Sequence, residues 1–273
     1  MASTISLTPL KSRGPLTFGS LLFVALLALA GWNDVLAEDI LFVNDSATYC
    51  PYTLCDGGKN GFVVDIVDAI YKSAGYNVKI VNVPWNRAIL MVRTGHADGI
   101  LGILKGSAPN FIYPKTEVAS YTPAVFSLKA NPWEFTGVDS LKEVHLGLVQ
   151  NYDNGSFDPA LERYLASDPS NVAYISNEQP LQHLFMMIEA NHTDATIDDS
   201  FVGTYLLQKM GKQKLFKLTP YPVKPVPAYI GFNNKDQKSQ RLADVFDTGL
   251  AKLRKTGELK SILANYGLTD WKK

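Results

Sequence analysis

The stretch GFVVDIVDAIYKSAGYNVKIVNVPWNRAILMVRTGHADGILG, residues 61–102, alternates between helix-like and strand-like patterns. Apolar residues recur at helical spacing over residues 65–74, and an apolar strand pattern follows at residues 78–83. Pro84 then opens a second amphipathic helix, and residues 100–104 predict the next strand. Strands that alternate with helices pair mainly in parallel, so this stretch predicts an α/β fold.

The same alternation continues on both sides of this stretch. Further strands are predicted at residues 40–43, 145–149, 195–197 and 228–232, and further helices at 159–166, 181–188, 200–210, 242–253 and 259–263. Ser176 and Gln179 predict a capping box before the helix at 181–188. The pattern predicts two lobes, each a mainly parallel sheet flanked by helices. Extended segments near 123–129 and 222–232 would form a hinge, and the cleft between the lobes is the expected ligand site.

The N-terminal segment has the order of a secretory signal peptide. Lys11 and Arg13 precede an apolar run at residues 16–30, and residues 35–37 supply the small side chains that a signal peptidase recognises. Cleavage after Ala37 would export the chain to the periplasm. An uncleaved membrane anchor is the alternative, although the run is shorter than the roughly 20 apolar residues that a span needs.

Charge and cysteine content limit the classes of function. The chain has 26 Lys and Arg against 26 Asp and Glu, so no nucleic-acid partner is expected. Export to an oxidising compartment favours a disulfide between Cys50 and Cys55, and free thiols are the alternative. A metal site would need further ligands close by, but the 4 histidines are scattered. The sequence therefore predicts neither a metal nor a cofactor.

Six segments, taken in order, resemble one protein family. They are NDSATYCPY (44–52), GFVVDIVDAIYKSAGY (61–76), VPWNRAILMVRTGHADGILG (83–102), SLKEVHLGLVQNY (140–152), HTDATIDD (192–199) and KLRKTGELKSILANYG (252–267). Together they resemble the extracellular solute-binding protein family 3, the polar amino-acid receptors of bacterial ABC importers. The resemblance spans nearly all of the chain after residue 37.

The resemblance implies a two-lobed periplasmic-binding-protein fold of type II and a binding function without catalysis. Lobe one would comprise residues 38–125 and 228–273, and lobe two residues 126–227. As a monomer, the chain would deliver a small polar solute, an amino acid or a related amine-bearing compound, to the membrane permease of an ABC importer. A receptor that feeds a membrane sensor is the alternative, and a dehydratase-like enzyme is a further one.

The resemblance also implies which side chains face the cleft, namely Asp45, Tyr49 and Trp85 in lobe one, and Tyr152 and Asp199 in lobe two. Asp199 would hold the α-ammonium of the ligand, because a carboxylate in a closed cleft needs a cationic partner. Alternatively, Asp199 caps the helix that follows it. Tyr49 and Trp85 would enclose the ligand and attract an ammonium through their rings.

Three neighbouring residues are given other roles. Asp45 would accept hydrogen bonds from a ligand side chain, or stabilise its own turn. Tyr52 is assigned to packing. Asp198, directly before Asp199, is assigned to solvent or to a cap.

The chain departs from the family at the expected carboxylate clamp. The family has a Thr-x-x-Arg motif here, and its two slots fall at Ser107 and Asn110, in KGSAPN. An asparagine cannot make the two-pronged contact of arginine with a carboxylate. Either Lys105 supplies the missing charge, or Asn110 binds a neutral group, or the ligand is not an α-amino acid. Asp153, in the turn after the strand of lobe two, would repel an anion and favours a cationic or hydroxyl-rich ligand.

Overall fold

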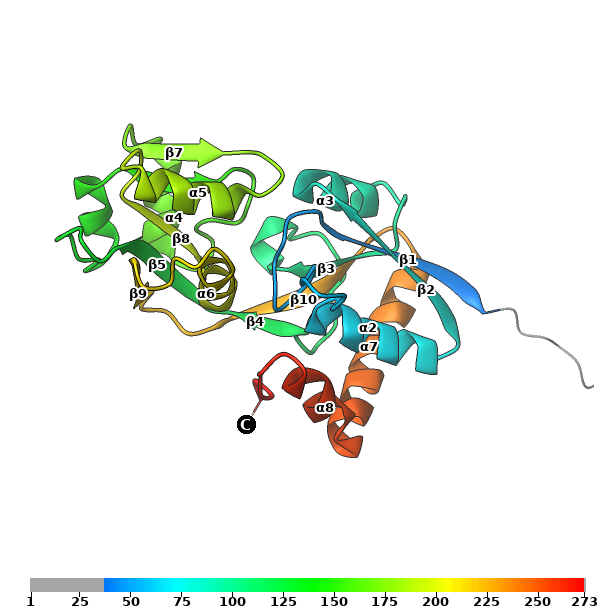
Figure 1. Ribbon diagram of the computed structural model, residues 1–273. Coiled ribbons are helices and arrows are strands. Elements are labelled where there is room, and N and C mark those ends of the chain that lie inside the picture. The colour runs from blue at the N-terminus through cyan, green and yellow to red at the C-terminus, as the bar shows by residue number, and fades with distance from the viewer. Residues whose placement is uncertain (1–36, 273) are drawn as a thin grey trace, which may run out of the picture. The chain divides into compact units, whose positions relative to one another are not determined.

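The computed structural model describes residues 37–272 of the chain. The predicted signal peptide, residues 1–37, lies outside these residues except for its last residue, Ala37. Within them, no helix combines the length and the apolar character that crossing a membrane requires. Figure 1 shows strands grouped into two sheets, with helices packed against both.

Each sheet has five strands. In spatial order the first consists of β2 (Tyr76–Val83), β1 (Glu38–Asp45), β3 (Gly99–Ile103), β10 (Val226–Phe232) and β4 (Ala119–Tyr121). The second consists of β7 (Val172–Ile175), β6 (Leu146–Val149), β8 (Ala195–Asp199), β5 (Pro123–Leu128) and β9 (Phe216–Pro220). The helices are α2 (Phe62–Ser73), α3 (Trp85–Arg93), α4 (Pro159–Ala166), α5 (Pro180–Glu189), α6 (Ser200–Lys209), α7 (Gln237–Thr256) and α8 (Glu258–Ala264), with short 3-10 turns η1 (Lys105–Ser107) and η2 (Val138–Glu143).

The two sheets repeat one pattern of strand directions. In the first sheet β1 pairs in parallel with β2 and β3, and β10 pairs antiparallel with β3 and β4. In the second sheet β6 pairs in parallel with β7 and β8, and β5 pairs antiparallel with β8 and β9. The predicted α/β class is confirmed. The parallel strands are those that alternation with helices predicts, and each antiparallel partner comes from a segment that connects the two sheets.

Strand side chains alternate between two helical layers, as a strand buried on both faces requires. In β1, Ile40 and Phe42 pack in the cluster that contains α2 and α7, whereas Val43 packs against Val92 of α3. In the second sheet, Phe126 packs with α5 and α6, while its neighbour Val125 joins the cluster of α4. Helices therefore cover both faces of both sheets, which leaves the carboxyl ends of the parallel strands as the natural place for a site.

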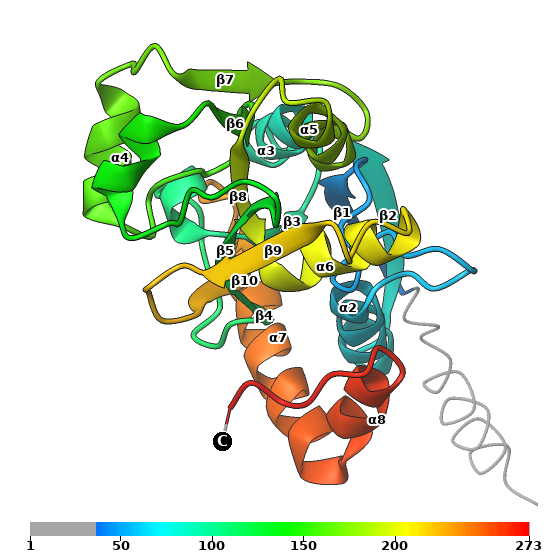
Figure 2. The same cartoon turned by 60° about the vertical axis from the view of Figure 1, so that its left-hand side comes forward.

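The chain passes between the two sheets twice (Figure 2). Thr122 alone separates β4 from β5, and residues 221–225 separate β9 from β10. The backbone N–H of Thr122 donates to Asp199 Oδ2 at 2.7 Å, and its carbonyl accepts from the Ser200 N–H at 2.8 Å. The first passage is thus bonded directly to the junction of β8 and α6. This first crossing, at Thr122, lies three residues before residue 125, the end that the sequence predicts for the first part of lobe one.

The helix starts show how local sequence and structure agree or differ. Asp158 caps α4 and Asp236 caps α7, each by accepting from a backbone N–H two residues later. The predicted capping box at α5 is wrong. The N-cap of α5 is Gln179 and not Ser176, and Gln179 makes no side-chain cap bond. Pro180 already fills the first helical position without an N–H. The Gln179 side chain instead accepts from the Thr48 N–H at 3.3 Å.

A disulfide closes the loop between β1 and α2. Cys50 and Cys55 are joined with their Cα atoms 4.8 Å apart. The loop ends at Gly61, which has a φ of 101° and lies so close to the loop that a Cβ would meet the Tyr52 carbonyl at 2.3 Å. Only glycine fits this conformation and this space. The loop is therefore held at both ends, and it carries two tyrosines of the site described below.

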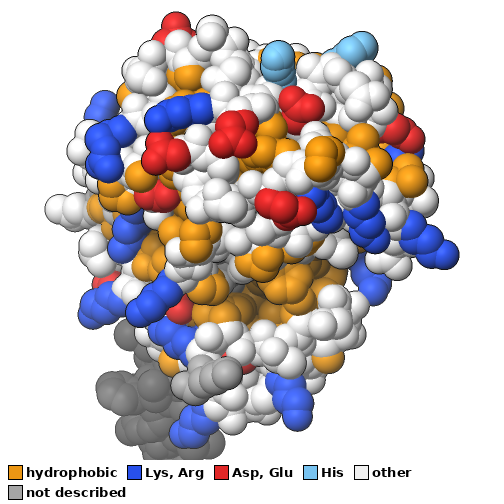
Figure 3. All heavy atoms as spheres, turned by 90° about the vertical axis from the view of Figure 1, so that its left-hand side faces the viewer, with side chains coloured by type: hydrophobic (Ala, Val, Ile, Leu, Met, Phe, Trp, Pro, Cys, Tyr) orange, Lys and Arg blue, Asp and Glu red, His pale blue; other side chains and the backbone are white. Residues whose placement is uncertain are grey.

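Charged side chains of both signs are interspersed on the face seen in Figure 3, with hydrophobic side chains exposed between them and within a hollowed part of that face. Five of the large exposed hydrophobic residues belong to elements of the second sheet or the segments beside it: Tyr174, Met186, Phe201, Leu215 and Leu218. No single sign of charge dominates this face, which agrees with the balanced composition.

Candidate functional site

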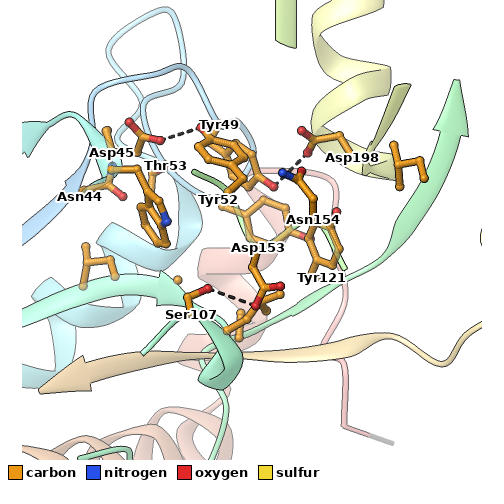
Figure 4. Close-up of a pocket in the computed structure, with 17 residues that line it drawn as sticks. Asn44, Asp45, Tyr49, Tyr52, Thr53, Ser107, Tyr121, Asp153, Asn154 and Asp198 are labelled. Carbon is orange, nitrogen blue, oxygen red and sulfur yellow. Dashed lines mark hydrogen bonds between the residues drawn. The ribbon is translucent and has the colours of Figure 1, made fainter. Parts of the chain in front are cut away.

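A cavity lies beyond the carboxyl ends of β1, β3, β6 and β8, and we call it the central pocket (Figure 4). The centre of a water-sized sphere can move through ≈ 90 Å³ inside it. Since a single water needs roughly 10–15 Å³ by this measure, the pocket has room for a small molecule. Its walls are Asn44, Asp45, Tyr49, Tyr52, Thr53, Trp85, Leu101, Gly102, Leu104, Ser107, Tyr121, Tyr152, Asp153, Asn154, Ile197, Asp198 and Ala228.

Five aromatic side chains form much of the wall. Tyr49 and Tyr52 come from the disulfide loop, Trp85 from the first position of α3, Tyr121 from β4, and Tyr152 from the turn after β6. The ring of Tyr152 meets the rings of Tyr49 and Trp85 edge-on, at centroid distances of 6.3 Å and 6.2 Å. Burial raises the pKa of Tyr49 well above its usual value, so its hydroxyl stays a hydrogen-bond donor. Burial does the same for the other three tyrosines.

Asp45, the last residue of β1, has a hydrogen-bond donor on each carboxylate oxygen. Its Oδ2 accepts from the Tyr152 hydroxyl at 2.6 Å, and its Oδ1 accepts from the Ala47 N–H at 3.2 Å. Burial raises the pKa of Asp45, and these two hydrogen bonds oppose that rise. The Tyr152 bond connects the first sheet with the turn after β6 of the second.

Asp198, in β8, is the carboxylate with an open side. Its Oδ1 accepts from the Tyr49 hydroxyl at 3.0 Å and from the Asp199 N–H at 2.7 Å. Among the described residues, no hydrogen bond reaches its Oδ2. The side chain lines the pocket although the residue is only 3% exposed. Burial raises the pKa of Asp198 to about 7, because a carboxylate withdrawn from water is costly to ionise.

Asp199 lies at the start of α6 and not on the pocket wall, where the family resemblance placed its carboxylate. It is 0% exposed and does not line the pocket. Its Oδ1 accepts from the N–H groups of Phe201 and Val202, which caps α6, and its Oδ2 accepts from Thr122 N–H and the Tyr52 hydroxyl. The structure agrees with the alternative prediction for Asp199, a helix cap: a residue at the N-cap turns its carboxylate toward the helix, and both oxygens accept hydrogen bonds from within the protein.

Asp153 forms part of the wall together with Ser107. Its Oδ2 accepts from the hydroxyls of Ser107 at 3.2 Å and Ser156 at 2.5 Å, and its Oδ1 accepts from the Ser156 N–H at 3.0 Å. Gly106, next to Ser107, packs so closely against this turn that a Cβ on it would lie 2.5 Å from Ser156 Oγ. Figure 4 marks one hydrogen bond of each aspartate with a dashed line: Asp45 with Tyr152, Asp153 with Ser107, and Asp198 with Tyr49.

Lys105 and Asn110 do not reach the pocket. The Lys105 ammonium lies 4.2 Å from the ring centroid of Tyr229 and 5.5 Å from that of Tyr113, in a cation–π arrangement at the surface. Asn110 is exposed. Of the described residues that line the pocket, none is Lys, Arg or His. No group of acidic, His or Cys side chains suited to a metal is found within residues 37–272.

A wider depression of ≈ 730 Å³ borders the central pocket, between α3 and the segment that runs from the turn after β6 into α4. The two share four wall residues: Ser107, Tyr152, Asp153 and Asn154. Asp153 therefore stands between the pocket and the more open space beside it.

Among the sequence-predicted site residues, the structure brings five together around the pocket: Asp45, Tyr49, Trp85, Ser107 and Tyr152. It places Lys105, Asn110 and Asp199 elsewhere. Sequence reasoning missed Asp198, Tyr52 and Tyr121. The alternation of side chains along a strand could have separated Asp198 from Asp199, but no pattern marked the short strand that carries Tyr121.

Comparisons with known proteins concern the family and the fold of the chain. A family model described as "Bacterial extracellular solute-binding proteins, family 3" matches residues 41–269. Among curated proteins, none matches the chain.

Solved structures with the same fold share few residues with the chain. An ancestral arginine-binding protein bound to arginine is 16% identical with a TM-score of 0.70, covering 85% of this chain and 99% of that one. A histidine kinase sensor domain similar to periplasmic binding proteins is 19% identical with a TM-score of 0.70, covering 85% and 96%. A Streptococcus pneumoniae ABC uptake transporter substrate-binding protein with bound histidine is 14% identical with a TM-score of 0.68, covering 84% and 92%.

Proposed function

The chain belongs to family 3 of the bacterial extracellular solute-binding proteins, and we propose that it binds a small, polar, amine-bearing solute in the central pocket and delivers it to the membrane permease of an ABC-type importer. It would act as a monomer in the periplasm, after removal of a signal peptide ending at Ala37. The family consists mainly of binding proteins, and we propose binding without catalysis for this member.

The observation that carries the proposal is the environment of Asp198. The carboxylate of Asp198, a residue only 3% exposed, lines the pocket, and one of its two oxygens has no donor from the described residues. Such a group costs free energy until a donor or a cation reaches it. An ammonium group placed there would supply both, and the rings of Tyr49 and Trp85 would add attraction to the charge.

The proposed movement follows from the two passages between the sheets. Lobe one would consist of residues 38–121 and 226–273, and lobe two of residues 123–220, with the hinge at Thr122 and at residues 221–225. These limits lie a few residues before the boundaries at 125 and 227 that the sequence predicts. Hydrogen bonds from Tyr49 to Asp198 and from Tyr152 to Asp45 would form as the lobes close on the ligand. Closure of this kind is a common way to enclose a small ligand.

A receptor that passes its ligand-bound state to a membrane sensor is the second candidate. The fold is shared with a histidine kinase sensor domain at a TM-score of 0.70, over 96% of that domain. Both candidates need the same pocket and differ only in the membrane partner. Co-purification with detergent-solubilised membrane proteins, with and without ligand, would separate a permease from a sensor.

A thermal-shift screen of the chain from residue 38 onward tests the binding proposal. The compounds would be amino acids, polyamines and other amines, sugars and organic acids, with calorimetry on every hit. A true ligand should raise the melting temperature, because it binds the folded state by mass action. The variant Asp198→Asn should lose the shift. A screen in which no compound gives a saturable shift would contradict a solute-binding role.

A further inference from the structure

We propose that the ligand is a small primary amine without a carboxylate, and that Asp153 excludes carboxylate-bearing solutes. This inference rests on the proposed function, since it concerns the solute bound in the same pocket. It commits to one half of the class named there, amines as opposed to amino acids.

The first argument is charge. Three carboxylates line the central pocket, those of Asp45, Asp153 and Asp198, and no Lys, Arg or His is among the described wall residues. A ligand carboxylate would lose its water and meet only negative charge. The side chain of Lys105, two positions before the wall residue Ser107, lies outside the wall and stacks on Tyr229.

The second argument is the supply of hydrogen-bond donors. Beside the pocket, the Ser107 hydroxyl, the Ser156 hydroxyl and the Ser156 N–H converge on a single carboxylate. That carboxylate is the protein's own, from Asp153. The chain therefore places an internal carboxylate on the donors that would otherwise suit one from a ligand, and these donors are already used.

The third argument is what remains available to a ligand. Both oxygens of Asp45 accept bonds from within the protein, whereas Asp198 Oδ2 receives none from the described residues. When the Asp198 carboxylate is ionised, its oxygens can only accept hydrogen bonds. A primary ammonium can donate to such an oxygen, whereas a quaternary ammonium has no N–H to donate. The ≈ 90 Å³ open to the centre of a water-sized sphere is room for several water-sized groups, which suits a small solute.

The fourth argument is access. The walls of the wider depression include one cation, Arg93, and one further carboxylate, Glu162, but neither lines the central pocket. Asp153 is the charged residue that the depression shares with the pocket, so a solute entering from that side passes its carboxylate. A negative charge at an entrance concentrates cations and repels anions. Asp153 would thus act on both the entry and the bound state of a carboxylate-bearing solute.

Calorimetric titration with matched pairs tests the inference. Each pair is an amine and the amino acid from which loss of the carboxylate would produce it: ethanolamine and serine, putrescine and ornithine, histamine and histidine, agmatine and arginine. At pH 8 we expect at least one amine to bind, at least tenfold more tightly than its amino acid. An amino acid that binds as tightly as its amine, or more tightly, would overturn the inference and leave the proposed function standing. If no member of any pair binds, both fail.

The variant Asp153→Asn tests the residue itself. It removes the charge while keeping the size, and it should reduce the ratio of amine to amino-acid affinity at least fivefold within the best pair. A purely structural role for Asp153 would weaken both members equally and leave the ratio unchanged, which would contradict the inference. Asp139→Asn is the matched control, because Asp139 is 95% exposed and pairs only with Lys142 at the surface.

Discussion

Asp45 in the first sheet and Asp198 in the second both lie near the end of a strand, and both accept a hydrogen bond from a tyrosine, but their remaining hydrogen bonds differ. Each accepts a hydrogen bond from a tyrosine that belongs to the opposite sheet's side of the pocket, Tyr152 for Asp45 and Tyr49 for Asp198. Asp45 has a second donor on its other oxygen, but Asp198 has both donors on one oxygen. Asp45 is therefore a structural brace, while Asp198 keeps one oxygen available to a ligand.

The difference shows how one fold with two similar sheets can build a one-sided site. Strand order and direction are the same in both sheets, so the backbone does not distinguish the two carboxylates. The distinction comes from the residues that follow: Asp45 enters a loop and bonds to Ala47, whereas Asp198 is followed by a helix cap. Changing the two aspartates and their tyrosines separates these roles.

The largest effect is expected for Asp198→Asn. Loss of the charge that pairs with a buried ammonium should weaken amine binding by about 2–5 kcal/mol, measured by calorimetry. The folded state should not lose stability at pH 8, because the variant also removes a carboxylate that is costly to bury. An unchanged dissociation constant would show that Asp198 is not the ligand's partner.

Asp199→Ala should act on stability instead. It removes the cap of α6 and leaves the Thr122 N–H and the Tyr52 hydroxyl without their acceptor, which should lower the free energy of unfolding by about 1–3 kcal/mol. Urea denaturation measures the loss. Asp236→Ala is the control, since Asp236 caps α7 through the Lys238 N–H at 2.9 Å in an exposed place, and it should cost less. A loss no greater than that of the control would contradict the role assigned to Asp199.

Binding should strengthen with pH. With the pKa of Asp198 at about 7, the fraction ionised rises about tenfold between pH 6 and pH 8, so amine affinity should rise by about the same factor. The stability of the ligand-free protein should change in the opposite direction. A raised carboxyl pKa means that the folded state binds the extra proton, so this contribution is complete below about pH 4 and is lost as pH rises through 7.

Titration and thermal melts of Asp198→Asn beside the parent protein isolate this group. The variant should show a flatter pH dependence in both measurements. If parent and variant have parallel profiles from pH 5 to pH 8, Asp198 does not titrate in that window.

The smallest effect is expected for Tyr152→Phe. The ring and its edge contacts with Tyr49 and Trp85 remain, but Asp45 loses a donor at 2.6 Å. Because this bond connects the two sheets, its loss should weaken ligand binding by about 1 kcal/mol. Calorimetry would detect such a change, and Tyr164→Phe, remote from the pocket, serves as the control. An effect as large as that of Asp198→Asn would mean that Asp45 is more than a brace.

Most of the helices and parallel strands could be predicted, because long apolar patterns identify them. The strands β4, β7 and β9 could not, since they are only partly buried, whereas β3 and β6, which are about as short, are buried along almost their whole length. The antiparallel pairing of β5 depends on where the chain crosses between sheets, which is a tertiary property.

The site was predictable where a residue's position follows from the end of a long element. Asp45 is the last residue of β1 and Trp85 is the first residue of α3, and both line the pocket. Of the adjacent pair, Asp198 lines the pocket and Asp199 caps α6, because the position of the α6 start decides which carboxylate becomes the cap. The sequence left the cap open as an alternative for both. The stacking of Lys105 on Tyr229 joins residues far apart in the chain, and no local pattern could reveal it.

The single-residue connection at Thr122 has a practical consequence for measuring occupancy. Its N–H and carbonyl are bonded to Asp199 and Ser200, directly beside the pocket carboxylate Asp198. A change in the position of Asp198 on ligand binding should therefore reach Thr122 through these two hydrogen bonds. A fluorophore attached on the solvent side of β4 or β9 should change its emission when the pocket fills, which would turn this protein into an optical reporter for its own solute.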